Sequence, residues 1–193
     1  MNNFIYIFIL NVLVNNFVFV QFLGLCPLMG TSKSMRTAIG MSIATSIVIM
    51  LTTILSFFIN YFFLIPYKLF FLRTMVYILI IAVSVQFMEI MTKYVSPLLY
   101  RSLGVFLPLI TTNCIVLAVP LLTYNLHYEF LTTVFYACSV SVGFSMIIII
   151  FSSLRERIDG LNIAIHVRGM PIFLITAGLM SMSFMGFNGL VKM

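Results

Sequence analysis

The sequence predicts an all-α membrane protein with six transmembrane helices, and three observations lead to this fold class. Of the 193 residues, 63% are hydrophobic and only 7% are charged, whereas soluble domains carry about 25% charged residues. Six apolar runs approach the ~20 residues that a helix needs to cross a bilayer. The polar stretches between them are too short to form a core of their own. We therefore expect one integral membrane domain over residues 1–193.

The six predicted spans are joined by short connections. In chain order they cover residues 4–25, 38–63, 70–91, 102–123, 130–151 and 171–191. The first lacks a basic segment before its apolar core and a small-residue cleavage site after it. We interpret it as a retained span and not as a signal peptide. Small residues allow close helix contacts in lipid, and they occur at Gly40, Ala44, Ala137, Ser141, Ser145, Ala177 and Ser181.

The basic residues predict the orientation of the spans. Seven of the ten Lys and Arg residues lie in the first, third and fifth connections, namely Lys33, Arg36, Lys93, Arg101, Arg155, Arg157 and Arg168. The positive-inside rule places these connections in the cytoplasm and both termini on the opposite side. A net charge of +6 that is spread over several loops does not predict binding to nucleic acid.

The chain divides into two halves of similar layout, approximately residues 1–95 and 96–193. Cys26 in the first span and Cys114 in the fourth lie at matching places, each beside helix-breaking residues. Three spans in each half reverse the orientation of the second half, which is typical of inverted repeats with discontinuous helices. We therefore expect two inverted three-helix repeats, with the first and fourth helices broken at the cysteine turns.

The two cysteine turns are the segments GLCPLMG (residues 24–30) and PLITTNC (residues 108–114). Pro27 favours extended backbone at Cys26. One interpretation is that the turns face each other and hold a metal; the alternatives are two packed thiols or a disulfide. We interpret Cys138, which has no helix breaker nearby, as a packing residue. Because iron–sulfur clusters normally use four thiolates, a cluster would require a partner chain with a similar cysteine pair; the alternative is a single four-coordinate ion shared in the same way.

Other polar residues have simpler interpretations. Lys93 follows Glu89 by four residues, a spacing that favours an interfacial ion pair, with a role in cation passage as the alternative. Residues 155–157 (RER) are expected to be solvated or to contact lipid headgroups, with docking of a cytoplasmic redox protein as the alternative. His127 and His166 receive no role. No phosphate-binding loop or dinucleotide fingerprint is present in the sequence, so we expect no nucleotide site.

Five features together resemble a known family. They are FLGLCP (residues 22–27), LPLITTNC (107–114), Glu89, LRER (154–157) and ITAGLM (175–180). Over essentially its whole length the chain resembles the A subunits of Rnf ion-translocating electron-transport complexes. It is also similar to the E subunits of sodium-translocating NADH:quinone reductases.

The resemblance implies a six-helix protein of the bacterial inner membrane, with periplasmic termini, that pairs with the homologous E subunit of Rnf. It further implies a [2Fe–2S] cluster inside the membrane, held by two cysteines from each of the two proteins, here Cys26 and Cys114. The remaining partners are the B, C, D and G subunits of Rnf and membrane lipid. Electron relay across the bilayer is coupled to movement of sodium ions or protons, and the chain has no active site of its own. The alternative is a permease or structural membrane protein with packed cysteines.

Overall fold

The computed structural model is predominantly helical over the residues that it describes, which are 2–32, 34–67, 70–95, 107–160 and 169–191. Within these ranges it contains no strand, so the predicted all-α class is confirmed. Four of the described helices are long and apolar enough to cross a membrane: Met35–Leu64, Arg73–Tyr94, Pro108–Asn125 and Phe130–Ile158. A fifth apolar stretch, Met170–Gly186, is shorter. Five basic residues lie outside the described residues: Lys33, Lys68, Arg101, Arg168 and Lys192. His166 and the predicted start of the fourth span lie outside them as well.

The first predicted span is not one helix. It consists of α1 (Asn2–Ile9) continued by the π-helical turn η1 (Leu10–Val14), an irregular stretch, and the short helix α2 (Leu25–Thr31). At the start of the irregular stretch, the side-chain Oδ1 of Asn16 accepts a hydrogen bond from the Val18 N–H at 3.0 Å. Asparagine offers the backbone this alternative to helical bonding. The expected break is therefore present, but it begins well before the cysteine turn.

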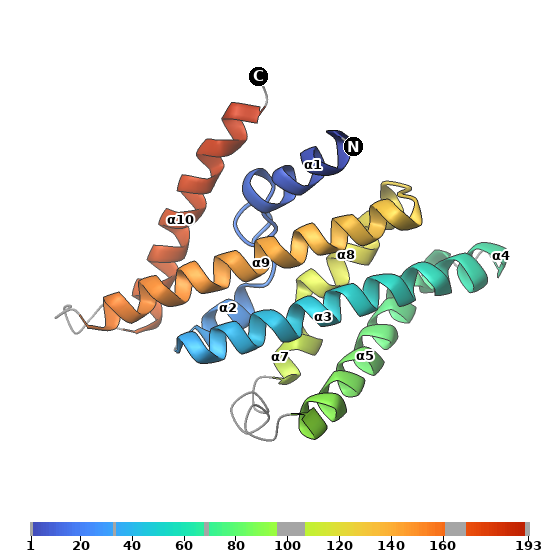
Figure 1. The fold of residues 1–193 in the computed structure, drawn as a ribbon, viewed down its shortest axis with the longest axis horizontal. Helices are drawn as coiled ribbons and strands as arrows, with labels where there is room; N and C mark the ends of the chain where they lie inside the picture. Colours follow the sequence, from blue (N-terminus) through green and yellow to red (C-terminus); the bar gives the residue numbers. More distant parts are fainter. Residues whose placement is uncertain (1, 33, 68–69, 96–106, 161–168, 192–193) are drawn as a thin grey trace.

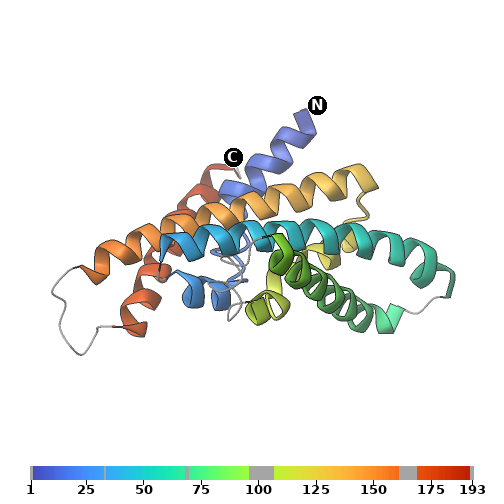
Figure 2. The ribbon, with the colours of Figure 1, turned by 60° about the horizontal axis from the view of Figure 1, so that its bottom comes forward.

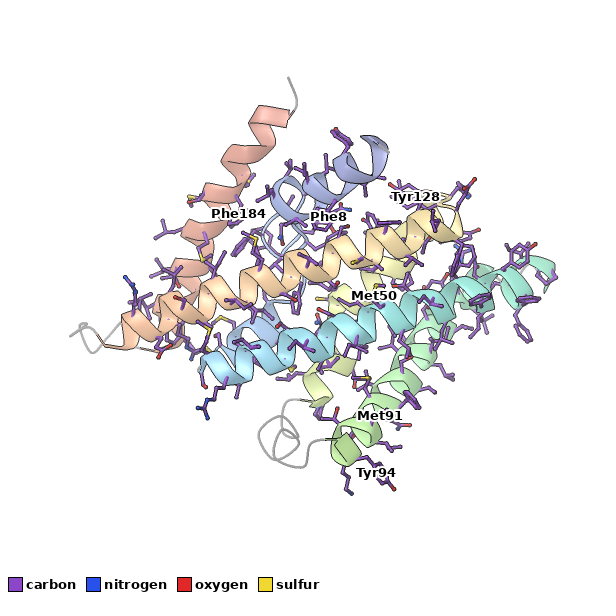
Figure 3. The ribbon with its side chains drawn as sticks, viewed as in Figure 1. Phe8, Met50, Met91, Tyr94, Tyr128 and Phe184 are labelled. Atoms are coloured by element: carbon purple, nitrogen blue, oxygen red, sulfur yellow. The ribbon has the colours of Figure 1, made fainter. Side chains whose placement is uncertain are left out.

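The second and third spans agree closely with the predicted runs. The second is α3 (Met35–Ile59), which continues through a π-helical turn, η2 (Asn60–Leu64). After the short α4 (Ile65–Tyr67) and η3 (Phe70–Leu72), the third span is α5 (Arg73–Val95). Large apolar side chains of α5 face outward, as lipid contact requires, among them Met75, Leu79 and Phe87. Figure 3 shows Met91 and Tyr94 at the outer end of this helix, away from the rest of the bundle.

The second half contains a second broken helix. The fourth span comprises α7 (Leu107–Thr111) and α8 (Cys114–Asn125), which are separated only by Thr112 and Asn113. The fifth span is α9 (Phe130–Asp159) and the sixth is α10 (Met170–Val191). Helix α9 extends past the predicted end at residue 151, so the RER segment is part of the helix and not of a loop.

The centre of the bundle is the pair α3 and α9, which lie side by side and run in opposite directions (Figures 1 and 2). Their contact includes a hydrogen bond between the hydroxyls of Ser46 and Ser145, 3.1 Å apart. Helices α5 and α8 pack against α3, whereas α1 and η1 pack against α9. Helices α3 and α9 are the second helices of the two proposed halves. Their antiparallel packing agrees with an inverted repeat, which stays a prediction.

Candidate functional site

The two cysteine turns lie against each other. The backbone N–H of Gly24, at the start of the first turn, donates a hydrogen bond to the Cys114 sulfur at 3.0 Å. Helices α2 and α7 are also in contact, and Gly30 of α2 lies so close to Leu109 that an added Cβ would be 3.1 Å from its Cδ1. The tertiary structure thus brings together two segments that are far apart in sequence. The role of their cysteines as ligands stays a prediction.

Gly24 sets the geometry of the first turn. Its φ of +79° lies in the left-handed region, which glycine adopts without steric cost. A Cβ at this position would be 2.7 Å from Cδ1 of Ile115, so the absence of a side chain also permits the close approach to α8. The bend precedes Cys26, which is the second residue of α2. The expectation of extended backbone at Cys26 is therefore wrong, because Pro27 occupies the first helical turn, where a missing N–H removes no hydrogen bond.

Asn113 sets the geometry of the second turn. It is the N-cap of α8, and its Oδ1 accepts a hydrogen bond from the Ile115 N–H at 3.3 Å. Cys114 is the first residue of this twelve-residue helix. The Nδ2 of Asn113 is buried without a hydrogen-bond partner among the described residues, and the residue is only 2% exposed.

Both turns reach the surface of this chain. The Cys26 side chain is exposed and that of Cys114 is half-buried, while Thr111 and Thr112 beside Cys114 are exposed as well. Among the described residues, no three His, Cys, Asp or Glu side chains are grouped closely enough to hold a metal ion. The described part of the chain thus offers two thiols at an accessible surface and lacks a complete four-ligand set.

Cys138 differs from both. It lies on α9 with its side chain exposed, so the interpretation as a packing residue is wrong. Its neighbours Ala137 and Ser139 are buried instead, because consecutive residues of a helix point about 100° apart. Lying on an uninterrupted helix, Cys138 is a useful reference for the other two cysteines.

Buried polar side chains hold the irregular stretch before Cys26 against α9 and α10. Asn16 donates from Nδ2 to the carbonyl oxygens of Val12 at 3.0 Å and Gly143 at 3.4 Å. Asn11 donates to the Ser139 hydroxyl at 3.0 Å, and Ser181 of α10 donates to the Phe19 carbonyl at 2.9 Å. Ser181 was predicted only as a small residue at a helix contact, and no sequence motif pointed to the two asparagines. The signal that could have found them is a group of asparagines within an otherwise apolar run.

Arg155 is buried, contrary to the expectation of a solvated or lipid-facing residue. It is 7% exposed, and its Nη1 donates to the Met29 carbonyl at 3.0 Å and to the Ser32 hydroxyl at 2.7 Å. Its guanidinium carbon lies 3.9 Å from the centre of the Phe173 ring. Arg155 therefore joins α9 to the end of α2 and to α10. Arg157, two residues later, is exposed.

Glu89 is half-buried on α5, and Lys93 is exposed one helical turn further on. Their ion pair stays a prediction, as does the alternative role in cation passage. His127 lies in the turn between α8 and α9 with a φ of +51°.

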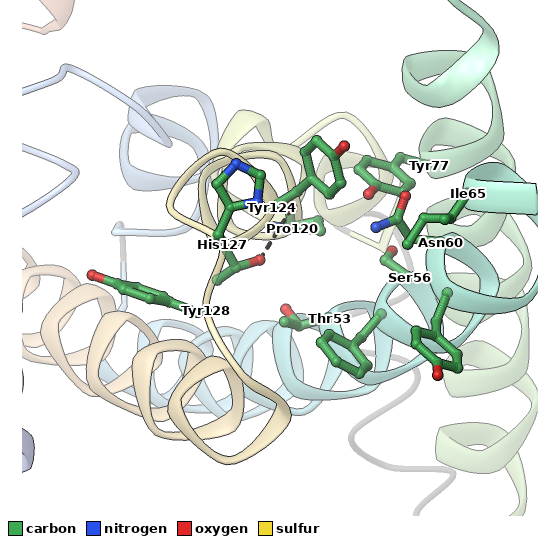
Figure 4. A pocket seen from close by; sticks show the side chains of 12 residues that line it. Thr53, Ser56, Asn60, Ile65, Tyr77, Pro120, Tyr124, His127 and Tyr128 are labelled. Atoms are coloured by element: carbon green, nitrogen blue, oxygen red, sulfur yellow. Dashed lines mark hydrogen bonds between the residues drawn. The ribbon is translucent and has the colours of Figure 1, made fainter. Parts of the chain in front are cut away.

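A cavity of about 190 Å³ lies at the other end of α8 (Figure 4), roughly 15 Å along the helix from Cys114. It is lined by α3, η2, α4, α5, α8 and the turn that follows α8, and His127 and Tyr77 are among its lining residues. The Ser56 hydroxyl and the Asn60 Oδ1 in its wall are buried without hydrogen-bond partners among the described residues. The cavity is thus separate from the cysteine turns, and its neutral polar groups suit water or a small polar molecule.

Comparison with known proteins places these features in a family. Residues 4–191 match the family described as Rnf-Nqr subunit, membrane protein. The A subunit of the ion-translocating oxidoreductase complex from Buchnera aphidicola subsp. Baizongia pistaciae is 53% identical over 190 residues, 98% of each chain. The proteins of the same name from Cronobacter sakazakii and Erwinia tasmaniensis are 52% and 53% identical over 192 residues, covering all of both chains.

Proposed function

The chain belongs to the Rnf-Nqr family of membrane subunits, and we propose that it is part of an ion-translocating oxidoreductase complex, in which it holds half of an intramembrane iron–sulfur site. Cys26 and Cys114 are the two ligands that this chain contributes. The homologous E subunit of Rnf contributes two further cysteines. The observation that carries the proposal is the contact between the two turns, in which the Gly24 N–H reaches the Cys114 sulfur.

The residues around the cysteines suit a cluster of this kind. Cys26 is exposed and Cys114 is half-buried, so a partner can reach both sulfurs. Hydrogen bonds to the sulfurs help to set the potential of an iron–sulfur cluster, and the Gly24 N–H supplies one. The buried Nδ2 of Asn113 is a further donor beside Cys114. When bound, a [2Fe–2S] cluster supplies one-electron transfer; the residues of this chain bind it, orient it and limit its contact with lipid.

The wider role follows from the same proposal. The protein relays electrons across the bacterial inner membrane between cytoplasmic and periplasmic redox proteins, within a complex that also contains the B, C, D and G subunits of Rnf. Electron transfer is coupled to movement of sodium ions or protons. Both termini lie on the periplasmic side, because seven of the ten basic residues lie in the first, third and fifth predicted connections, which include the helix ends beside them. This chain carries no active site of its own.

Cysteine variants in the purified complex test the ligand role. In a Cys26→Ser, Cys114→Ser double variant we expect the complex to lose the iron of one cluster and the corresponding electron paramagnetic resonance signal. Cys138→Ser is the matched control and keeps both, because Cys138 lies on an uninterrupted helix, α9. A double variant with the full iron content would contradict the proposal and favour a permease or structural membrane protein.

Electron transfer separates a relay from a structural cluster. In the double variant we expect reduction of the periplasmic redox centre by the cytoplasmic donor to stop, while the cytoplasmic proteins of the complex still oxidise that donor with an artificial acceptor. Retained reduction of the periplasmic centre, together with loss of the cluster signal, would remove the relay role and leave the cluster a structural one.

A further inference from the structure

The carboxyl end of α2, the helix that carries Cys26, is bound by residues of α9. The last four carbonyls of a helix lack partners within that helix, and in α2 these include the carbonyl of Met29. Arg155 of α9 supplies a donor to this oxygen at 3.0 Å and to the hydroxyl of the C-cap residue Ser32 at 2.7 Å. One turn earlier on α9, Ser152 donates to the Ser32 carbonyl at 3.3 Å.

From these contacts, and on the basis of the function proposed above, we propose that Arg155 is a positioning residue for the iron–sulfur site. It fixes the helix that carries Cys26 and places a buried positive charge at the carboxyl end of that helix. Met29 follows Cys26 by three residues, about 4.5 Å along the helix axis. A shift of the carboxyl end of α2 therefore moves the Cys26 sulfur almost as far.

The environment of Arg155 favours a fixed guanidinium. The side chain is 7% exposed and its guanidinium stacks on the Phe173 ring at 3.9 Å, an arrangement that adds a cation–π attraction. The charge also complements the partial negative charge at the end of α2. Both hydrogen bonds come from Nη1, whose two N–H groups are fixed in the guanidinium plane, whereas the donors of a lysine ammonium group rotate freely. Arg155 is thus suited to orienting α2 as well as to neutralising the partial negative charge at the carboxyl end of that helix.

The charge has a predictable effect on the cluster. A cluster bound by four thiolates is anionic, and reduction adds one more negative charge. A positive charge in a poorly solvated position stabilises the more negative state. Arg155 therefore raises the reduction potential, and its removal lowers it. Exposed Arg157 lies on the same helix and is screened by water, so loss of its charge has little effect on the potential.

The test uses the full complex with Arg155→Gln, Arg155→Lys and the matched control Arg157→Gln. Potentiometric titration followed by electron paramagnetic resonance gives the midpoint potential and the line shape of the cluster signal. We expect Arg155→Gln to shift the potential to more negative values and to alter the line shape. Arg155→Lys keeps the charge, so the potential returns toward the wild-type value while the line shape stays altered. Arg157→Gln leaves both unchanged.

Ser32→Ala provides a second test, which also serves if Arg155→Gln fails to assemble. It removes one acceptor of Arg155 and keeps the charge, so we expect an altered line shape with a smaller change in potential. If the Arg155 and Ser32 variants assemble and their cluster signal has the wild-type line shape and midpoint potential, the inference is overturned. If those variants behave like wild type while the cysteine double variant loses its signal, only the role of Arg155 fails. If the cysteine double variant keeps its signal, the proposed function fails first.

Discussion

The helix breaks before the two cysteines differ in length and in what holds them. The break before Cys26 runs from Asn15 to Gly24 and packs against α9 and α10 through buried side-chain hydrogen bonds. The break before Cys114 contains only Thr112 and Asn113, and a local cap closes it. The long break depends on distant parts of the chain, whereas the short break depends on its own sequence. We therefore expect substitutions in the long break to destabilise the protein more.

Asn16 should show the largest effect. It is 1% exposed, and its Oδ1 binds the Val18 N–H while its Nδ2 binds two carbonyls. Asn16→Leu leaves the buried Val18 N–H without its partner, at about 1–3 kcal/mol for such a group, and also removes the two hydrogen bonds that Nδ2 donates. We expect the free energy of unfolding in detergent to fall by about 3 kcal/mol. If Asn16→Leu lowered the free energy of unfolding less than Asn113→Ala does, the long break would not be the more sensitive of the two.

Gly24 ends the long break and contacts α8, the helix that follows the short break. Gly24→Ala places a Cβ at a φ of +79° and 2.7 Å from Cδ1 of Ile115. The left-handed backbone alone costs about 1–2 kcal/mol, so we expect a loss of about 2 kcal/mol and a changed cluster spectrum. Gly178→Ala is the control, because no atom lies within 4 Å of its added Cβ. Equal stability of the two variants would show that the close contact with α8 is unimportant.

Asn113 tests the short break. Asn113→Ala removes the cap of α8, in which Oδ1 accepts from the Ile115 N–H at 3.3 Å. Loss of an N-cap costs about 1 kcal/mol, and the unpartnered Nδ2 is lost with it. We expect the unfolding free energy to fall by about 1 kcal/mol, and Asn113→Asp to restore most of it, because an aspartate also caps. Failure of Asp to restore stability would show that the amide has another role.

Ser181 should show the smallest effect. It makes one hydrogen bond from α10 to the Phe19 carbonyl in the long break, at 2.9 Å. Interhelical hydrogen bonds in membranes contribute about 0.6 kcal/mol on average, so Ser181→Ala should lower the unfolding free energy by about that amount. Ser183→Ala is the control, since Ser183 is exposed and bonds within its own helix. A Ser181 effect as large as that of Asn16 would mean that α10 is the main support of the long break.

Local patterns in the sequence were enough to establish the fold class and the positions of most helices. The low charge content and the apolar runs predicted an all-helical membrane protein, and α3, α5, α9 and α10 include most of the residues assigned to their spans. Both cysteine turns were also recognisable, because glycine, proline and asparagine interrupt a helix through local sterics and hydrogen bonding that act within a few residues.

The residues that support these turns could not be predicted in this way, because they come from distant helices. The contact of Gly24 with Cys114, the burial of Arg155 against α2 and the exposure of Cys138 all depend on how the helices pack. Packing of apolar helices is set by contacts between residues far apart in the chain, which no local pattern encodes. A cysteine beside a helix breaker can be recognised from its neighbours, but the partner of its turn lies about half the chain away.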